Sequence, residues 1–524
     1  MANHGKLFES GCAGSEMEIE LKLLVARGDL DRVLTAGAVE RRSRGPARTS
    51  ELTSVYFDTP DGHLLSRGLA LRLRRSGGRW LQTLKSDAAQ GARGAAGLHA
   101  REEYEWAVAG RRIDFALLAK TPYGSVFASR RTREDLRPAF STRFRRTALR
   151  LDLEGGAQAE LCTDLGWIRA GNARAPICEV EIELDPGAGG PAALFAFARA
   201  LLEEVPFRLG AMSKAERGYA IARGDRPRPR KAEDVALHAD MNRAGALFAI
   251  ARACLAQVHA NEDGFLSDRD PEFLHQLRVG YRMLRVALAM PEDPDWRAAR
   301  EPLREELRWL FSAIGPARNW DVFLTEVLPP LLQRERGDAG LAAFRARCLR
   351  RRRRHLAAAR EAVRGARYTA LLLAIGELLA GPLPAEAPGQ AASARSFASA
   401  VIERRDRALR RRGGTLAEAS PEDRHRARIA AKKLRYCAEF FAALYPHKRA
   451  GRYVEALSEL QDALGAVNDA AICARLIGEA GASGRVDGRT IGLVQGWVAA
   501  AEARAVDGLA RAWDGFARRT PFWT

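Results

Sequence analysis

Three charged residues alternate with apolar ones near the start of the chain, in Glu18-Ile19-Glu20-Leu21-Lys22. On an extended strand, side chains at positions i, i+2 and i+4 point to the same face, so two carboxylates and one ammonium share one side. A strand that buries its apolar residues should not direct three charges inward, unless that face lines a solvated cavity that handles ions. The pattern therefore predicts a strand whose charged side binds ions.

The same alternation returns four more times in the first two-fifths of the chain. The positions are Arg72 and Arg74, Thr83 and Lys85, then Arg101, Glu103 and Glu105, and finally Glu179, Glu181 and Glu183. Each strand alone could be an ordinary half-exposed antiparallel strand with a solvated charged face. Acidic and basic strands are interspersed, however, which favours a closed barrel that holds a metal and a polyanion together.

Further motifs in this region follow the order typical of one family. They are Glu18-x-Glu20-x-Lys22, Tyr56-Phe57-Asp58-Thr59-Pro60, Leu71-Arg72-Leu73-Arg74, residues 80–85, Arg101-x-Glu103, Glu160 and Asp164 before Gly166, residues 176–183, and Ser213-Lys214-Ala215-Glu216-Arg217-Gly218-Tyr219. With these motifs the chain resembles the CYTH domain of triphosphate tunnel metalloenzymes. The resemblance implies an eight-stranded antiparallel tunnel that binds a triphosphate group with a divalent metal and usually cleaves or transfers it.

The resemblance also implies roles for individual residues. The carboxylates expected to hold one or two Mg²⁺ or Mn²⁺ ions are Glu18, Glu20, Glu103, Asp164, Glu181 and Glu183, and the cations expected to bind phosphates are Lys22, Arg72, Arg74, Lys85, Arg146 and Lys214. Of these, Glu18, Glu20, Lys22, Arg72, Arg74 and Lys85 form the predicted catalytic set. A bound metal polarises phosphoryl oxygens and can lower the pKa of a bound water, so no nucleophilic side chain is needed. Arg143 and Arg145 lie beside Arg146, and the sequence does not rank the three.

The net charge of the chain limits the choice of partner. Its 524 residues carry 84 Lys and Arg against 65 Asp and Glu, a formal charge of +19, so a polyanion is expected. The seven cysteines are scattered without a Cys-x-x-Cys pair, which predicts reduced thiols in a cytoplasmic protein. The longest apolar stretch, residues 368–380, is too short to span a bilayer, so no membrane partner is expected.

A chain of this length predicts two or more domains. Strand alternation dominates up to about Leu184, and the stretch 223–231 is rich in Arg and Pro, which indicates a linker. Helical periodicity follows, with one break rich in Pro and Gly at 381–389. We therefore predict an α+β multidomain fold, with a flexible tail at 1–16, the tunnel at 17–222, a linker at 223–236 and an all-α domain at 237–524, built from repeats 237–380 and 390–524.

The two helical halves repeat each other at an offset of 150 residues. His275-x-x-Arg278-x-x-x-Arg282-x-x-Arg285 reappears as His425-x-x-Arg428-x-x-x-Lys432-Lys433-x-Arg435, and Ile314-Gly315-x-x-Arg318-Asn319 reappears as Leu464-Gly465-x-x-Asn468-Asp469. Spacings of three and four place the first set on one helical face. Like charges on one face repel each other, so the arrangement costs stability unless a polyanion or acidic partners neutralise it. One such helix could be a solvated basic face, but the matched repetition argues against that.

With these repeats the second region resembles the CHAD family, a conserved-histidine α-helical domain often fused behind a CYTH domain. The resemblance implies binding of inorganic polyphosphate along a basic surface between the repeats, at His275, Arg278, Arg282, Arg285, His425, Arg428, Lys432, Lys433 and Arg435. Each histidine accompanies arginines, which would repel a cation, so anion contact or a buried hydrogen bond is favoured over zinc binding. Aromatic residues are few and not interleaved with the basic faces, so nucleic acid is not expected as a partner.

These features together predict a metal-dependent inorganic triphosphatase that hydrolyses tripolyphosphate to diphosphate and phosphate and carries a polyphosphate-binding helical domain. Two alternatives stay open. Relatives of the tunnel cyclise ATP or hydrolyse thiamine triphosphate, so the protein could be a triphosphatase or a cyclase that acts on an organic triphosphate. The sequence discloses no pocket for a base. The chain could instead be a non-catalytic protein that binds polyphosphate or is targeted to it.

Overall fold

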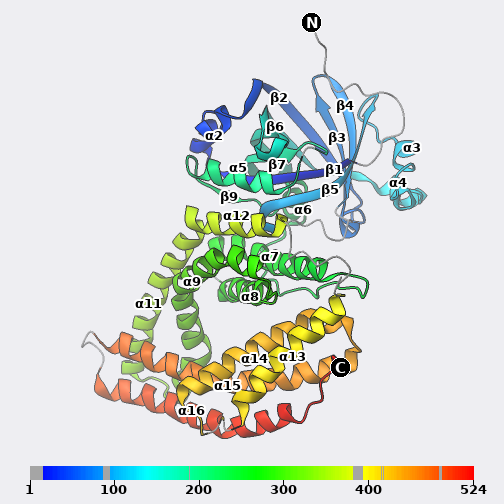
Figure 1. Ribbon diagram of the computed structural model, residues 1–524. Coiled ribbons are helices and arrows are strands. Elements are labelled where there is room, and N and C mark those ends of the chain that lie inside the picture. Colours follow the sequence, from blue (N-terminus) through cyan, green and yellow to red (C-terminus); the bar gives the residue numbers. More distant parts are fainter. Residues whose placement is uncertain are drawn as a thin grey trace. The chain divides into compact units, whose positions relative to one another are not determined.

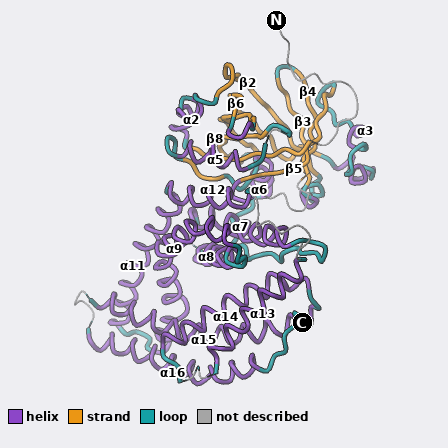
Figure 2. Tube along the Cα trace, viewed as in Figure 1, coloured by secondary structure: helices purple, strands orange, loops and turns teal. Residues whose placement is uncertain are grey.

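Strands dominate the first part of the chain and helices the second, as the sequence periodicity predicts (Figures 1 and 2). The computed structural model describes residues 16–86, 95–187, 189–268, 270–381, 393–414, 416, 418–482 and 487–524. One unit comprises Met1–Pro227 with Thr369–Gly381, and the other comprises Arg228–Tyr368 with Pro382–Thr524. Residues 1–15 of the predicted tail and residues 382–389 of the predicted break lie outside the described residues.

The first unit is built on a closed antiparallel barrel. Its strands are β1 (Glu16–Val25), β2 (Ser43–Asp58), β3 (Leu69–Ser76), β4 (Arg79–Ser86), β5 (Leu98–Val108), β6 (Arg137–Asp152), β7 (Gln158–Ala170) and β8 (Ala173–Leu184). They pair in the order β5-β4-β3-β2-β6-β7-β8-β1, and β1 pairs again with β5, which closes the ring. A short strand, β9 (Phe207–Leu209), adds to β1. The predicted eight-stranded antiparallel tunnel is therefore confirmed.

The apolar core of the barrel unit lies largely outside the ring of strands. On β1, Leu21 and Leu23 are fully buried on the outer face, whereas Lys22 between them points into the lumen. The outside of β3–β5 packs under a second layer through Leu64, Leu69, Leu71, Leu84, Tyr104, Leu118 and Phe127. Each fully buried side chain of this kind contributes about 1.5–3 kcal/mol. Burial outside the ring therefore stabilises the barrel while the lumen stays available to charged groups.

Short helices surround the barrel. They are α1 (Leu30–Leu34), α2 (Gly37–Glu40), α3 (Phe115–Leu118), α4 (Arg130–Asp135), α5 (Ala192–Leu202) and α6 (Lys214–Arg223). Helix α6 packs on β6–β8, where Phe140 stacks on Tyr56 with ring centroids 4.4 Å apart and meets Tyr219 of α6 edge-on at 4.9 Å. A Cβ at position 218 would lie 2.1 Å from Phe140 Cε2, so this approach requires Gly218. Helix α6 thus covers the part of the lumen that these rings fill.

The second unit is helical. Its helices are α7 (Arg243–Ser267), α8 (Pro271–Leu288), α9 (Pro294–Val322), a π-helical turn at Phe323–Val327, α10 (Leu328–Arg334), α11 (Ala339–Arg364), the start of α12 (Ala366–Ala380), α13 (Ala394–Gly413), α14 (Pro421–Phe441), α15 (His447–Gly481) and α16 (Gly488–Ala517). The two histidine motifs occupy α8 and α14, and the second repeated motif occupies α9 and α15. The repeated sequence therefore folds into corresponding helices.

Most of helix α12 belongs to the barrel unit. The hydroxyl of Thr369 donates a hydrogen bond to the Phe207 carbonyl at 3.0 Å, and Glu377 pairs with Arg199 at 2.7 Å. The apolar run between these residues is buried in the protein. Within the described part of the chain, no helix is both long enough and apolar enough to cross a membrane.

Candidate active site

The lumen is lined by the charged residues that alternate inward on neighbouring strands. Lys22 of β1 lies opposite Glu181 of β8, and Glu20 lies opposite Glu183. Further lumen pairs are Arg72 with Thr83, Lys85 with Glu103, Arg146 with Asp164, and Asp164 with Glu179. Lys22 is only 1% exposed, so an ammonium group lies deep inside the barrel. The strand register thus gathers charges that are far apart in the sequence into one cavity, as the pairing of Glu20 with Glu183 shows.

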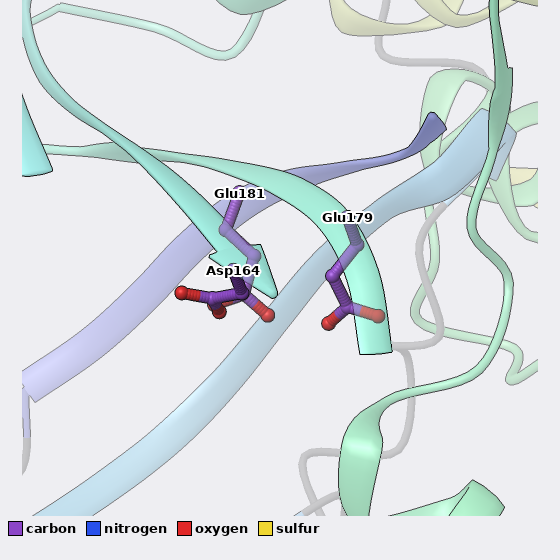
Figure 3. Close-up of side chains that lie close together, drawn as sticks. All are labelled: Asp164, Glu179 and Glu181. Atoms are coloured by element: carbon purple, nitrogen blue, oxygen red, sulfur yellow. The ribbon is translucent and has the colours of Figure 1, made fainter. Parts of the chain in front are cut away.

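Three carboxylates from β7 and β8 converge in this lumen: Asp164, Glu179 and Glu181 (Figure 3). One oxygen of each lies within 4.8 Å of the others, a spacing that could hold a metal ion. Lys214 of α6 contacts the three at 2.7, 2.6 and 2.9 Å, respectively. Lys22 contacts Glu181 and lies 3.5 Å from Glu179. We call this group the inner acidic cluster.

Two arginines complete the inner acidic cluster. Arg146 of β6 donates two hydrogen bonds to Asp164, at 2.6 and 2.8 Å, and it also contacts Glu181. Arg217, one turn beyond Lys214 on α6, pairs with Glu179 at 2.6 Å. Bidentate arginine–carboxylate pairs fix both partners in orientation as well as in distance. The carboxylates are therefore held rigidly by four basic side chains.

Burial disfavours the charged forms of the side chains in this cluster, but the opposite charges of their neighbours favour those forms. Burial raises the pKa of Glu181, but the lysine and arginine cations around it outweigh this effect and hold the pKa well below its usual range. Burial lowers the pKa of Lys22 and Lys214, but the carboxylates outweigh it and raise the pKa of both. Buried charges that depend on one another in this way are stable as a complete set, and loss of one partner is costly.

A second group of carboxylates, here called the outer acidic cluster, consists of Glu18, Glu20, Glu103 and Glu183. Lys85 lies 2.5 Å from Glu18 and 3.1 Å from Glu103. Glu20 lies 3.5 Å from Lys22, whereas the carboxylate of Glu183 forms no ion pair or hydrogen bond with any described residue. Burial and the charge of Glu18 raise the pKa of Glu183 to about 8, although Lys85 opposes the shift. Uncompensated carboxylate oxygens are the ligands that hard divalent cations prefer, so these residues fit Mg²⁺ or Mn²⁺.

The opposite wall of the lumen is basic. Arg72 of β3 pairs with Glu103 at 3.3 Å, but its Nε is buried without a hydrogen-bond partner among the described residues. Arg74 donates to the Ser54 hydroxyl at 3.3 Å and forms no ion pair with a described residue. Burial and the charges of Arg72 and Arg146 lower the pKa of Arg74 to about 10. Arg74 is half-buried, and a partly desolvated guanidinium that lacks a counterion is suited to receive an anion.

Helix α6 presents Lys214 to the lumen through its first turn. Ser213 caps the helix by accepting a hydrogen bond from the Glu216 amide at 3.1 Å, and the Glu216 carboxylate accepts one from the Ser213 amide at 2.8 Å. This capping box fixes where the helix starts and therefore where Lys214 points. Arg101 of β5 holds Glu216 at 3.3 Å, which ties the cap to the barrel wall.

The helical unit contains a second basic region, where α8 packs against α14. Burial and the cations Arg282 and Arg428 lower the pKa of Lys432 to about 7, so α8 and α14 raise the positive potential of each other. Burial, Arg282 and Arg318 lower the pKa of Arg278 to about 9. These shifts arise because several cations share a partly desolvated space without enough carboxylates. We call this region the α8–α14 basic face.

Acidic compensation of the α8–α14 basic face is weak. Arg428 lies 3.8 Å from Asp469, and Arg435 lies 3.5 Å from Glu439. Arg278, Arg282, Arg285, Lys432 and Lys433 form no ion pair with a described residue. Burial and the charge of Arg318 lower the pKa of His275 to about 4, so this histidine is neutral at physiological pH. His425 hydrogen-bonds Asn468 at 2.9 Å through Nδ1.

Comparison with known proteins identifies both regions. The family model of the CYTH domain matches residues 16–219, and that of the CHAD domain matches residues 249–478. The chain therefore contains a CYTH domain and a CHAD domain. Both predicted resemblances are therefore confirmed. The CYTH family consists of metal-dependent tunnel enzymes, which agrees with the acidic clusters in the barrel.

Individual relatives each cover only part of this chain. An inorganic triphosphatase of Haemophilus influenzae is 31% identical over 172 residues, which cover 32% of this chain and 46% of that protein, so the match spans about half of its length. The CHAD domain of Ricinus communis is 30% identical and covers 55% of this chain and 96% of its own, with a TM-score of 0.48. A Hippeastrum protein described as a putative adenylyl cyclase with a dominant triphosphatase activity is 20% identical and covers 41% of this chain and 98% of its own, with a TM-score of 0.29.

All predicted tunnel residues of the CYTH domain face one lumen. They are Glu18, Glu20, Lys22, Arg72, Arg74, Lys85, Glu103, Arg146, Asp164, Glu181, Glu183 and Lys214. Two further residues belong to the inner acidic cluster but were given no site role from the sequence. The alternation already placed Glu179 on the face of Glu181 and Glu183, and Arg217 follows Lys214 by one helical turn. The choice among the three neighbouring arginines is also decided, because Arg143 and Arg145 are exposed on the outer face while Arg146 points inward.

The predicted polyphosphate residues of the CHAD domain lie on α8 and α14. His275, Arg278, Arg282 and Arg285 are on α8, and His425, Arg428, Lys432, Lys433 and Arg435 are on α14. Arg278 and Arg285 lie over the Phe311 ring at 5.6 and 4.9 Å from its centroid. This packing orients both guanidinium groups and leaves them without carboxylate partners.

Proposed function

We propose that the CYTH domain is a metal-dependent inorganic triphosphatase that hydrolyses tripolyphosphate to diphosphate and phosphate. The observation that carries this proposal is the division of the lumen into two walls. Glu183 of β8 forms no ion pair with a described residue, and neither does Arg74 of β3 on the other wall. A complex of a divalent cation with a phosphate chain supplies what each wall lacks.

The lining of the lumen favours an inorganic substrate over an organic one. Tyr56, Phe140 and Phe144 lie in one apolar cluster with Tyr219 of α6, so these rings are already occupied. Most of the remaining lumen positions described above are charged, which suits phosphate and offers little to an adenine or thiazole ring. ATP and thiamine triphosphate therefore stay as the alternative substrates. The match to an inorganic triphosphatase supports the same choice.

The residues of this chain divide the catalytic work. Glu18, Glu20 and Glu183, with Glu103, Asp164 and Glu181, would hold one or two Mg²⁺ or Mn²⁺ ions. A metal bound there would supply charge stabilisation of phosphoryl oxygens and a more acidic bound water.

Lys22, Arg72, Arg74, Lys85, Arg146 and Lys214 bind the non-bridging oxygens and keep the phosphate chain extended along the lumen. Because the cations are preorganised by ion pairs and by the cap of α6, charge that develops on the leaving diphosphate is stabilised without large rearrangement.

Replacement of Arg72 by Ala should separate phosphate binding from metal binding. One charge-assisted hydrogen bond contributes about 1.5–3 kcal/mol, so tripolyphosphate kcat/KM should fall by about tenfold or more. Calorimetric titration with Mn²⁺ should give nearly the wild-type affinity, since the guanidinium faces the anion. Arg145→Ala, the same change on the outer face, is the control and should alter neither quantity. An equal loss of Mn²⁺ affinity in Arg72→Ala would refute this division of roles.

We further propose that the α8–α14 basic face of the CHAD domain binds inorganic polyphosphate. The unpaired cations from both repeats and the lowered pKa of Lys432 support a site that gains stability when an anion enters. The alternative, a protein that only binds or is targeted to polyphosphate, would need an inactive tunnel. The complete lumen set argues against that.

We place this activity in the cytoplasm. The six cysteines among the described residues are all free thiols, which supports the reducing location expected from their scattered positions.

A further inference from the structure

A row of exposed side chains crosses the outer face of the barrel, on the strands labelled β4, β3, β2, β6 and β7 in Figure 1. Strand register places five residues directly opposite one another in turn: Trp80, Arg75, Thr53, Arg143 and Trp167. Because opposed residues on neighbouring strands share a face, all five point away from the lumen. We call this set the outer row.

The outer row combines free cations with exposed aromatic rings. Arg75, Arg143 and Thr53 are exposed, and neither arginine forms an ion pair with a described residue. Trp167 is 45% exposed, which makes it one of the few large exposed apolar side chains of the described structure. Trp80 is half-buried at the other end. Two tryptophans therefore bracket two unpaired arginines.

An additional arginine lies over each tryptophan. Arg174 lies over the Trp167 ring, 4.7 Å from its centroid, and Arg111 lies over Trp80 at 5.4 Å. Both arginines are exposed and have no ion pair with a described residue. Trp309 is also covered by an arginine, Arg367, but that arginine forms an ion pair with Glu306 at 2.7 Å. Arg174 and Arg111 differ from it because they lack such a carboxylate within the described part of the chain. The arginines beside the outer row keep their full charge available to a partner.

We propose that the outer row is a binding surface for single-stranded nucleic acid. Such surfaces combine a basic track for the phosphate backbone with aromatic rings on which unpaired bases stack. Neighbouring strands lie about 4.8 Å apart, so the path from Trp80 to Trp167 around the curved sheet is roughly 19 Å. It follows half of the closed ring of eight strands, so a bound strand would wrap around the barrel. That span corresponds to roughly five or six bases at about 3.4 Å each. Arg75 and Arg143 lie between the two stacking positions, where the backbone would pass.

The chemistry of the outer row distinguishes this partner from other polyanions. Polyphosphate has no ring to stack on Trp167 or Trp80, and duplex nucleic acid keeps its bases inside. The face also carries Glu51, which lies opposite Arg145 next to the row. Its charge moderates the purely electrostatic attraction and increases the relative weight of stacking. The sequence did not predict a nucleic acid partner, because aromatic residues are few and are not interleaved with the basic faces of the helices. The outer row does combine aromatic and basic residues, but strand pairing is needed to see it.

The test is binding of a fluorescein-labelled single-stranded 12-mer, measured by anisotropy with the full chain. All proteins carry Arg282→Glu and Lys432→Glu, so that the α8–α14 basic face does not contribute. Trp167→Ala should weaken binding by about tenfold or more, since stacking of one base accounts for that magnitude, and Trp167→Phe should restore most of it. Trp309→Ala is the control and should bind normally. Removing Arg75 and Arg143 together should reduce the salt slope by about 1.4, as expected for two lost phosphate contacts.

Hydrolysis of tripolyphosphate and the melting temperature report on folding and should stay unchanged in Trp167→Ala, because the residue faces outward. The proposal is overturned if the 12-mer fails to bind, if Trp167→Ala binds it as well as the parent protein does, or if duplex of the same length binds equally tightly. Loss of binding to anionic vesicles in Trp167→Ala, with the 12-mer still bound, would also overturn it and would assign the row to a membrane surface.

Discussion

Tripolyphosphate hydrolysis should fall by at least about a hundredfold when Glu20 is replaced by Gln, which corresponds to about 3 kcal/mol of transition-state stabilisation. Glu20 lies opposite Glu183 in the lumen and is 7% exposed, so the substitution removes a charge from the outer acidic cluster while it keeps the size of the side chain. A divalent cation held by fewer carboxylate charges binds more weakly and stabilises the developing charge less.

The expected pattern distinguishes loss of metal binding from loss of folding. Mn²⁺ affinity measured by calorimetry should drop together with turnover, whereas the metal-free variant should stay folded, because the lost contact with Lys22 at 3.5 Å is offset by relief of the repulsion between Glu20 and Glu183. Glu51→Gln makes the same chemical change on the outside of β2 and should behave as wild type. Wild-type turnover in a folded Glu20→Gln protein would refute the metal-tunnel assignment.

Reversing one charge in each repeat of the CHAD domain should abolish most polyphosphate binding. The charges of Arg282 on α8 and Lys432 on α14 act on each other, so Arg282→Glu with Lys432→Glu places two negative charges in the middle of the basic face. Affinity for long-chain polyphosphate should fall by about a hundredfold or more, and the salt dependence should become shallower because fewer counterions are released. Filter binding over a range of salt concentrations measures both effects.

The matched control changes the same number of charges elsewhere. Arg504 and Arg511 are exposed on α16, and Arg504→Glu with Arg511→Glu should reduce binding only slightly. The double reversal at the basic face should raise the melting temperature, because it relieves the crowding that lowers the pKa of Lys432. Tripolyphosphate hydrolysis should remain nearly normal, since the tunnel has its own ligands. Equal losses in the two double variants would mean a diffuse charge effect without a defined site.

Strand parity made much of the tunnel predictable from the sequence. Alternation over Glu18, Glu20 and Lys22 fixes which face they share, and closure of the barrel then turns that face into a lumen. Helical spacing likewise placed Arg278 and Arg282 on one face. These are local patterns, so a single sequence carries them in full.

Other features depend on contacts between distant segments. The ranking of Arg146 above Arg143 and Arg145 required the position of Asp164, which lies on the next strand. The contribution of Arg217 depends on how α6 packs against β8, since its partner Glu179 comes from that strand. The outer row joins residues from five strands through register alone. Periodicity within one segment cannot reveal such neighbours.

The central claim is tested most directly by phosphate release from tripolyphosphate, ATP and thiamine triphosphate, measured side by side with the full chain. Each substrate is assayed with Mg²⁺, with Mn²⁺ and after chelation. We predict that tripolyphosphate has the highest kcat/KM, that release stops with chelator, and that it resumes when the metal is restored. Hydrolysis of tripolyphosphate that persists in chelator, or a higher kcat/KM for ATP or thiamine triphosphate, would contradict the assignment of this tunnel as a metal-dependent inorganic triphosphatase.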